Sequence, residues 1–236
     1  MYGNKDMARD MPETEDNMLV DKTEYLTAGI HIGMKSCTPF MRRFIYKVRE
    51  DGVAVFNLKM LDERLLTAAK FISGFSKIMV VSRKEAAGKA VTVFAKVVGA
   101  KATAGRFPPG TLTNPSFKEF YEPDIVIVAD PLVDDQAVKE AKKKRIPIVA
   151  ICNTFNTARD IDLIIPMNNN GKKSLALAFW ILSREMLKAR GELKAGKFKM
   201  KIEDFGGETE PAEQEGDAES GGPKTKAKKG VEQHAA

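Results

Sequence analysis

Short, uninterrupted apolar runs alternate along the chain with segments whose apolar residues recur at helical spacing. The run Ile125–Ala129 is mostly β-branched, as expected for a parallel strand that is covered on both faces. In the polar segment that follows, acids at 134 and 135 and bases at 142–145 suit the two ends of a helix. A second apolar run, Ile148–Ile151, completes a unit of strand, crossover helix and parallel strand. We expect the rest of the core to stack beside this unit.

The same alternation extends over most of the chain. The pattern predicts further strands at 45–48, 53–58, 78–81, 100–104 and 163–165, and further helices at 23–28, 62–75, 85–98 and 172–190. Such an order predicts an α/β fold with a three-layer α/β/α core and a mostly parallel sheet. We expect a single domain over residues 21–205, with a flexible N-terminal extension over 1–20 and a disordered charged tail over 206–236.

One long segment, Gly105–Phe120, interrupts the alternation. Its sequence, GRFPPGTLTNPSFKEF, contains three prolines and two glycines, which predicts a long loop without regular structure. We expect this loop to be rigid and to present Arg106 and Phe107 to RNA or to a neighbouring protein. The alternative is that Phe107 fills the core while Arg106 is solvated.

Charge is distributed unevenly. Residues 1–20 and residues 206–236 each carry a net charge of −3, so the central 185 residues hold +12. A compact domain of that basicity favours a polyanionic partner such as nucleic acid, and the alternative is a solvated basic surface.

Basic residues are interleaved with aromatic residues between positions 35 and 49. This mixture is typical of surfaces that combine phosphate contacts with base stacking, although a hairpin with a solvated basic face and aromatics in the core would give the same pattern. Two lysines at the start of the helix 172–190 follow three asparagines, and a helix N-terminus can hold a phosphate. The lysine-rich segment 142–145 is a weaker candidate, because the helix dipole explains it sufficiently. The candidate RNA-binding residues are Lys35, Arg42, Arg43, Lys47, Arg49, Arg83, Lys84, Arg106, Lys172 and Lys173.

An alternative function is that of a nucleotide-binding α/β enzyme, with its ligand in the crevice beyond the carboxyl ends of the strands. No GxGxxG motif follows the first strand, and Asp130, before a proline, is typical of a turn or cap residue. We expect His31 to bond backbone or RNA, since the sequence names no partners for catalysis. The crevice would be lined by Asn57, Ser82, Arg83, Asp130, Asn153 and Thr154.

Other classes of protein are not indicated. Cys37 and Cys152 form no CxxC motif or Cys/His cluster, so we expect neither a disulfide framework nor a metal site, and a reducing cytosol fits. The longest apolar run, Leu175–Leu182, is well short of the roughly 20 residues that a membrane crossing requires. We predict no catalytic residue, no cofactor, no small-molecule substrate and no membrane insertion.

Three segments in a fixed order resemble a known family. These segments are YLTAGIHIG at Tyr25–Gly33, GRFPPGTLTNP at Gly105–Pro115, and EPDIVIVADP followed by AVKEAKKKRIPIVAICNT, and together they are similar to ribosomal protein S2 (uS2). FIYKVREDG and IPMNNNGKKSLALAFWIL resemble the archaeal and eukaryotic branch, and the form looks archaeal. Bacterial members insert a long helical hairpin after the TLTN segment, and here only Pro115–Pro123 intervenes. The chain also lacks the basic residue that commonly follows the proline of the Asp130-Pro131 pair.

The resemblance covers residues 23–190 and implies a flavodoxin-like fold without flavodoxin chemistry. It also implies a structural, rRNA-binding component of the small (30S) ribosomal subunit that takes part in translation and subunit assembly near the mRNA exit side. The implied partners are small-subunit rRNA and neighbouring small-subunit proteins, with mRNA or initiation factors nearby, and the implied location is the ribosome in the cytoplasm.

Overall fold

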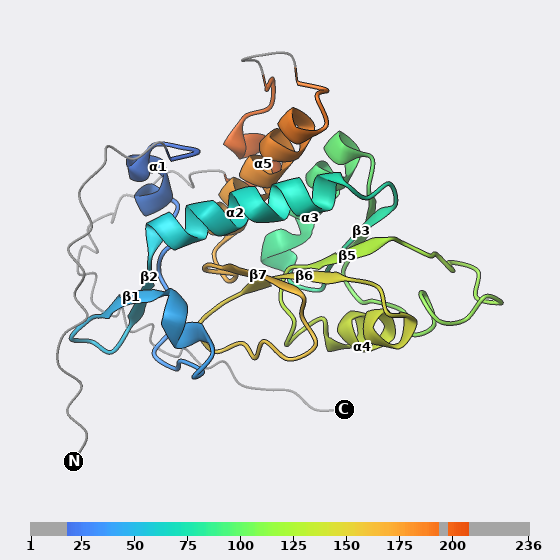
Figure 1. The fold of residues 1–236 in the computed structure, drawn as a ribbon, viewed down its shortest axis with the longest axis horizontal. Coiled ribbons are helices and arrows are strands. Elements are labelled where there is room, and N and C mark those ends of the chain that lie inside the picture. Colours follow the sequence, from blue (N-terminus) through green and yellow to red (C-terminus); the bar gives the residue numbers. More distant parts are fainter. Residues whose placement is uncertain (1–17, 194–197, 208–236) are drawn as a thin grey trace, which may run out of the picture.

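The structure is a computed structural model that describes residues 18–193 and 198–207. Every strand and helix that the pattern predicts is present, with shifts at the ends. Figure 1 shows the elements, which in chain order are α1 (Lys22–Thr27), the 3-10 helix η1 (Met41–Phe44), β1 (Ile45–Val48), β2 (Ala54–Phe56), α2 (Leu58–Ser73), β3 (Ile78–Ser82), α3 (Glu85–Val98), β4 (Lys101–Ala104), β5 (Ile125–Val128), α4 (Asp135–Lys144), β6 (Ile148–Cys152), β7 (Leu163–Pro166), α5 (Lys172–Ala189) and the 3-10 helix η2 (Ile202–Phe205).

Five of the strands form one parallel sheet in the order β4-β3-β5-β6-β7. Counted within this sheet, the order is second, first, third, fourth, fifth, which is the flavodoxin-like order. All residues of β3, β5 and β6 are buried, because helices or loops cover both faces of the sheet. The fold class expected from the sequence is therefore confirmed.

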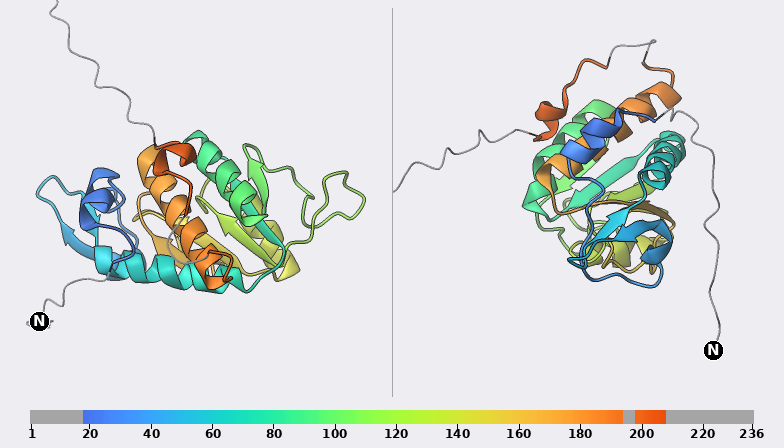
Figure 2. Two further views of the ribbon diagram at one scale, coloured as in Figure 1. Left: turned by 90° about the horizontal axis from the view of Figure 1, so that it is seen from above. Right: turned by 90° about the vertical axis from the view of Figure 1, so that its left-hand side faces the viewer.

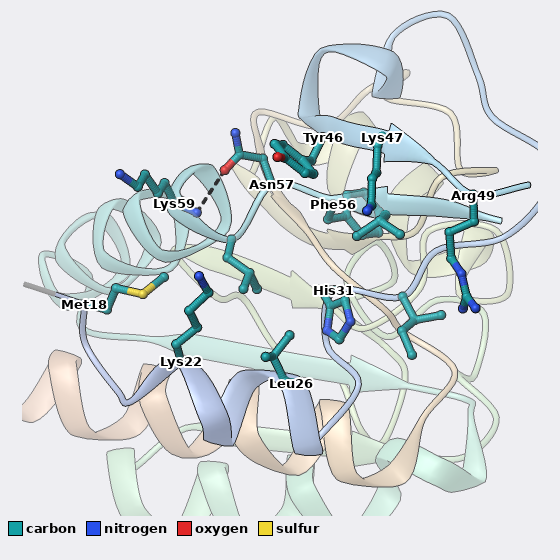
Figure 3. A pocket seen from close by; sticks show the side chains of 13 residues that line it. Met18, Lys22, Leu26, His31, Tyr46, Lys47, Arg49, Phe56, Asn57 and Lys59 are labelled. Carbon is teal, nitrogen blue, oxygen red and sulfur yellow. Dashed lines mark hydrogen bonds between the residues drawn. The ribbon is translucent and has the colours of Figure 1, made fainter. Parts of the chain in front are cut away.

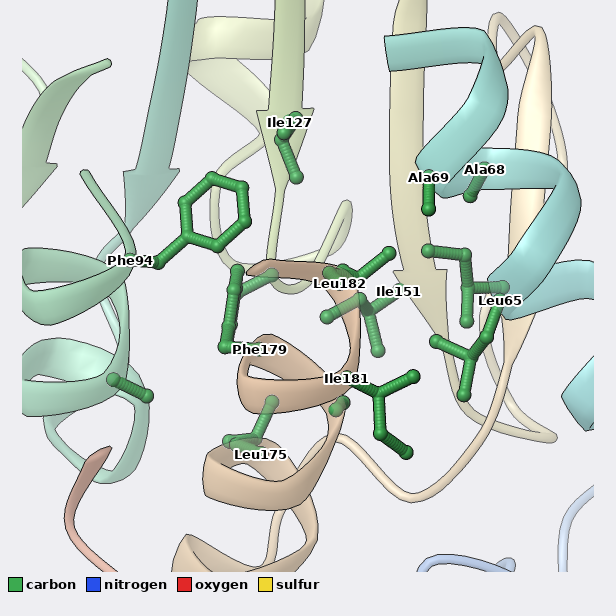
Figure 4. Close-up of a cluster of buried hydrophobic side chains, with 14 of the residues drawn as sticks. Leu65, Ala68, Ala69, Phe94, Ile127, Ile151, Leu175, Phe179, Ile181 and Leu182 are labelled. Atoms are coloured by element: carbon green, nitrogen blue, oxygen red, sulfur yellow. The ribbon is translucent and has the colours of Figure 1, made fainter. Parts of the chain in front are cut away.

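Three helices, α2, α3 and α5, pack together on one face of the sheet (Figures 1 and 2). Phe94 of α3 meets Phe179 of α5 at 5.4 Å between ring centroids, and Leu65 of α2 joins the same cluster. Figure 4 shows Phe94, Phe179 and Leu65 in one cluster with Ile127 and Ile151 of the central strands. This larger core explains why α5 is apolar on most of its surface.

The opposite face is covered more thinly. The narrow apolar side of α4, together with the side chains of Met41, Phe44, Phe107 and Leu112, packs on it. The long loop is ordered as predicted, but the expectation that it presents Phe107 is wrong. Phe107 is 5% exposed and fills the space beside α4, because one helix alone cannot cover this face, whereas Arg106 is exposed.

Buried Glu140 of α4 fixes the loop. Its carboxylate accepts hydrogen bonds from the backbone N–H of Gly110 at 2.7 Å and of Leu112 at 3.1 Å, from the Thr113 hydroxyl at 3.3 Å and from the Gln136 amide at 2.8 Å. Burial alone would raise the pKa of Glu140, but these four donors outweigh it and lower the pKa. The loop is thus held by a charged group of the core, which its proline content did not reveal.

Residues at both ends of the described chain pack on the core. The Leu19 N–H binds the Asp62 carboxylate and Val20 is buried, so the described chain already packs on the core before residue 21. At the other end Phe205 is buried between α3 and α5, and the Trp180 indole donates to the Met200 carbonyl at 2.7 Å. The predictions of flexible or disordered segments at 1–17 and 208–236 lie outside the described residues.

Candidate nucleic-acid interface

The crevice between β3 and β5, where a doubly wound sheet would hold a nucleotide, is closed by an internal ion pair. The Lys84 ammonium lies 2.5 Å from Oδ2 of Asp130, whose other oxygen accepts from the Asn156 amide at 2.9 Å and from the Leu132 N–H at 3.0 Å. Lys84 also donates to the Asn169 carbonyl at 3.1 Å and to the Asn170 amide oxygen at 2.5 Å. Asp130 is therefore a satisfied structural carboxylate.

This arrangement bears on the prediction that Lys84 contacts RNA. Only 17% of its side chain is exposed, and its three ammonium protons have partners within the chain. Lys84 therefore lacks a free proton for a phosphate.

The crevice beyond β6 and β7 is covered by residues 29–38, which precede the first hairpin. The Met34 N–H donates to the Thr154 hydroxyl at 3.0 Å, the Thr38 N–H donates to the Thr154 carbonyl at 2.9 Å, and the Asn168 N–H donates to the Ile30 carbonyl at 2.9 Å. At Gly33 the fit is so close that an added Cβ would lie 2.5 Å from Cγ2 of Thr154. The ends of β6 and β7 are thus covered by the protein's own chain.

Asn57 does not belong to this crevice, contrary to the prediction. Its side-chain oxygen accepts from the Lys59 N–H at 3.0 Å and caps α2, which explains why this helix begins at Leu58 rather than at residue 62. The predicted crevice set is therefore only partly brought together.

Two titratable groups below the crevice are shielded from solvent. Burial raises the pKa of Asp134 to about 6, although the Arg83 N–H donates to its Oδ1 at 2.7 Å. Burial, with Asp130 nearby, also raises the pKa of the Cys152 thiol, which is therefore protonated and a poor nucleophile at neutral pH. Within the described residues, no group of three or more His, Cys, Asp or Glu side chains could hold a metal ion.

The basic residues of η1 and β1 are arranged differently from Lys84. Arg42, Arg43 and Lys47 are exposed, and within residues 18–193 and 198–207 none of them forms an ion pair with a carboxylate. The Arg43 guanidinium lies 4.1 Å from the centroid of the half-exposed Phe40 ring. By contrast, Phe44 is buried, so the interleaved aromatics are divided between surface and core. These three cations are available to an external anion.

The lysines of α4 make a useful contrast. Lys139 pairs with Asp135, Lys142 lies 2.7 Å from Asp160, and Lys144 lies 3.7 Å from Glu122. Three of the four lysines of α4 thus have a carboxylate partner within the chain.

A cleft of about 1020 Å³ lies beside β1, between α1, the hairpin and the start of α2 (Figure 3). Two of the predicted RNA-binding residues, Lys47 and Arg49, line it, and so do Lys22 and Lys59, which no local pattern marked as functional. Only the fold brings these four cations together. Burial lowers the pKa of His31, which also lines the cleft, so its ring is neutral at pH 7.

The remaining candidates are spread over the surface. Lys172 and Lys173 are exposed at the start of α5, where Asn170 approaches the Met34 sulfur at 3.9 Å and so lies beside the residues that cover the crevice. Exposed Arg106 follows β4, at the edge of the sheet opposite β7. The other two exposed candidates are Lys35, near the hairpin turn, and Arg83, at the end of β3.

Comparison with known proteins gives a consistent result. The family described as "Ribosomal protein S2" matches residues 25–120 and 117–189. The chain is 48% identical over 190 residues to "Small ribosomal subunit protein uS2" of Ignicoccus hospitalis, covering 79% of this chain and 90% of that protein. It is 49% identical over 178 residues to the protein of the same name from Staphylothermus marinus, covering 75% of this chain and 81% of that protein.

Proposed function

This chain belongs to the ribosomal protein S2 family of the small ribosomal subunit, and from that premise we propose that it binds small-subunit rRNA through the exposed basic surface of η1 and β1. The observation that carries the proposal is the contrast in charge pairing. Arg42, Arg43 and Lys47 have no carboxylate partner in the described chain, whereas the α4 lysines are largely paired. When an unpaired exposed cation binds a phosphate, the free-energy cost is small, because no internal ion pair has to break.

We further propose that Lys172 and Lys173 extend this surface. They lie at the N-terminal end of α5, whose free backbone N–H groups and dipole favour an anion. The family resemblance supports a position in the 30S subunit near the mRNA exit, with contacts to neighbouring ribosomal proteins and with mRNA or initiation factors close by. It also supports a cytoplasmic location on the ribosome.

An enzymatic function is not favoured, because the observations on the crevice oppose it. The Lys84–Asp130 pair lies at the ends of β3 and β5, and Gly33 packs closely on Thr154 at the end of β6. The strand order of the sheet also occurs in nucleotide-binding proteins, but a shared fold does not specify a shared chemistry.

Two measurements test the proposal. A tagged copy should sediment with small subunits on a sucrose gradient, and Arg42→Gln/Arg43→Gln/Lys47→Gln should weaken that association. On a small-subunit rRNA fragment, the slope of log affinity against log salt should flatten by about two to three for the triple variant, since each lost phosphate contact removes nearly one released counterion.

The matched control changes three lysines that have carboxylate partners, Lys139→Gln/Lys142→Gln/Lys144→Gln. It removes the same charge but should alter the salt slope much less. Equal slopes and affinities for wild type and the first triple variant would remove η1 and β1 from the RNA-binding surface.

A further inference from the structure

We propose that the cleft beside β1 holds an unpaired RNA nucleotide, with its base against Tyr46 and its phosphates on the surrounding cations. This inference rests on the proposed function and makes it more specific, because it names single-stranded RNA as the ligand of this part of the surface. The cleft, of about 1020 Å³, is large enough for a nucleotide, since ligand pockets typically measure about 300–1,000 Å³.

The lining of the cleft combines the two properties that single-stranded nucleic acid requires. Lys22 of α1 and Lys47 and Arg49 of the hairpin line it from different sides (Figure 3). Arg49 reaches Asp51 only at 3.7 Å, a contact of two exposed groups that water screens. The charges therefore favour a flexible polyanion that can turn within the cleft.

The apolar part of the lining is exposed to an unusual degree. Tyr46 is 68% exposed, and Leu26 and Ile32 are also among the exposed large hydrophobic residues. Such a concentration of exposed apolar side chains marks an interaction site more often than an accident of folding. The Tyr46 ring projects from β1 beside Lys47, so a base that stacks on the ring would have its phosphate near the lysine.

The shape of the cleft favours a single strand over a duplex. In double-stranded RNA the bases are stacked inside and the accessible minor groove is shallow, so side chains meet mainly phosphates and 2′-hydroxyls. The apolar walls of a concave site make no favourable contact with such a duplex surface. They can, however, bury the face of an unstacked base. Asn57 adds specificity for base edges, because its oxygen caps α2 and its amide N–H groups have no partner among the described residues.

The test uses the full-length chain and a fluorescent ten-nucleotide oligouridylate, either free or annealed to its complement. We expect the free strand to bind several-fold more tightly than the duplex at equal salt. Tyr46→Ala should lower single-strand affinity by roughly tenfold without changing the salt slope, whereas Tyr46→Phe should keep it. Lys47→Gln should instead flatten the slope by about 0.7.

Leu132→Ala is the matched control, since Leu132 is 66% exposed but lies in the loop after β5, away from the cleft lining. It should leave affinity unchanged, and circular dichroism confirms that each variant is folded. The proposal is overturned if the duplex binds as tightly as the single strand and Tyr46→Ala leaves the affinity unchanged. It is also overturned if oligoglutamate of equal charge displaces the RNA as well as oligouridylate does. Normal incorporation into small subunits alongside either result would show that the cleft inference fails while the proposed function stands.

Discussion

Breaking the ion pair between Lys84 and Asp130 should lower the free energy of unfolding substantially. Asp130 is fully buried, so replacing Lys84 with methionine leaves a carboxylate in the protein interior with only the Asn156 and Leu132 donors. Removing one partner of a buried pair typically costs about 3–5 kcal/mol. That is a large part of the roughly 5–15 kcal/mol by which domains are stable. We therefore expect Lys84→Met to lower the free energy of unfolding by about 3 kcal/mol or more.

Urea unfolding followed by circular dichroism measures this change. The double variant Lys84→Met/Asp130→Asn should be less destabilised than the sum of the single variants, because the second change removes the orphaned charge. Lys139→Met is the control, since Lys139 and Asp135 are both more than half exposed and such pairs contribute about 0–1 kcal/mol.

The same variant decides between the two interpretations of Lys84. If Lys84→Met costs less than about 1 kcal/mol but flattens the salt dependence of RNA binding, the internal pair is unimportant and the RNA contact predicted from the sequence is correct. A large loss of stability with an unchanged salt slope for the folded fraction would establish a structural role.

Three further changes test the core and its ends. Because burial raises the pKa of Asp134 to about 6, the folded state retains a proton that the unfolded chain loses near pH 4. The free energy of unfolding should therefore fall as the pH rises from about 4 to about 6. Asp134→Asn should remove up to about 3 kcal/mol of that fall, measured by urea unfolding at pH 4.5 and pH 7.5. Phe107→Ala should destabilise the protein by about 3–5 kcal/mol, whereas Arg106→Gln should change urea stability by less than about 0.5 kcal/mol, and the reverse order would contradict the packing of the loop. Phe205→Ala should also cost about 3–5 kcal/mol, while truncation after Gly207 should leave the melting temperature within a few degrees, and a large drop on truncation would show that residues beyond 207 pack on the core.

The sequence by itself determined the elements and the fold class, for a physical reason that lies in local patterns. Strands covered on both faces must be continuously apolar, which is why Ile125–Ala129 and Ile148–Ile151 could be identified directly. Helix ends follow local capping and charge, so α3 begins at Glu85 and ends before Gly99, as predicted. Arg42, Arg43 and Lys47 are exposed, as expected for charged residues in a segment whose core positions are taken by Met41 and Phe44.

The tertiary structure alone decided which polar and aromatic residues face outward. Phe44 and Tyr46 are two residues apart in the same basic segment, yet one fills the thinly covered face of the sheet and the other lines a cleft. Lys84 and Lys47 were both predicted to bind RNA, but only Lys84 meets a buried carboxylate, that of Asp130 in the segment after β5. Lys22 and Lys59 join the cleft only because α1 and α2 pack beside the hairpin. Charge pairing and surface shape depend on contacts between distant segments, and such contacts exist only once the chain has folded.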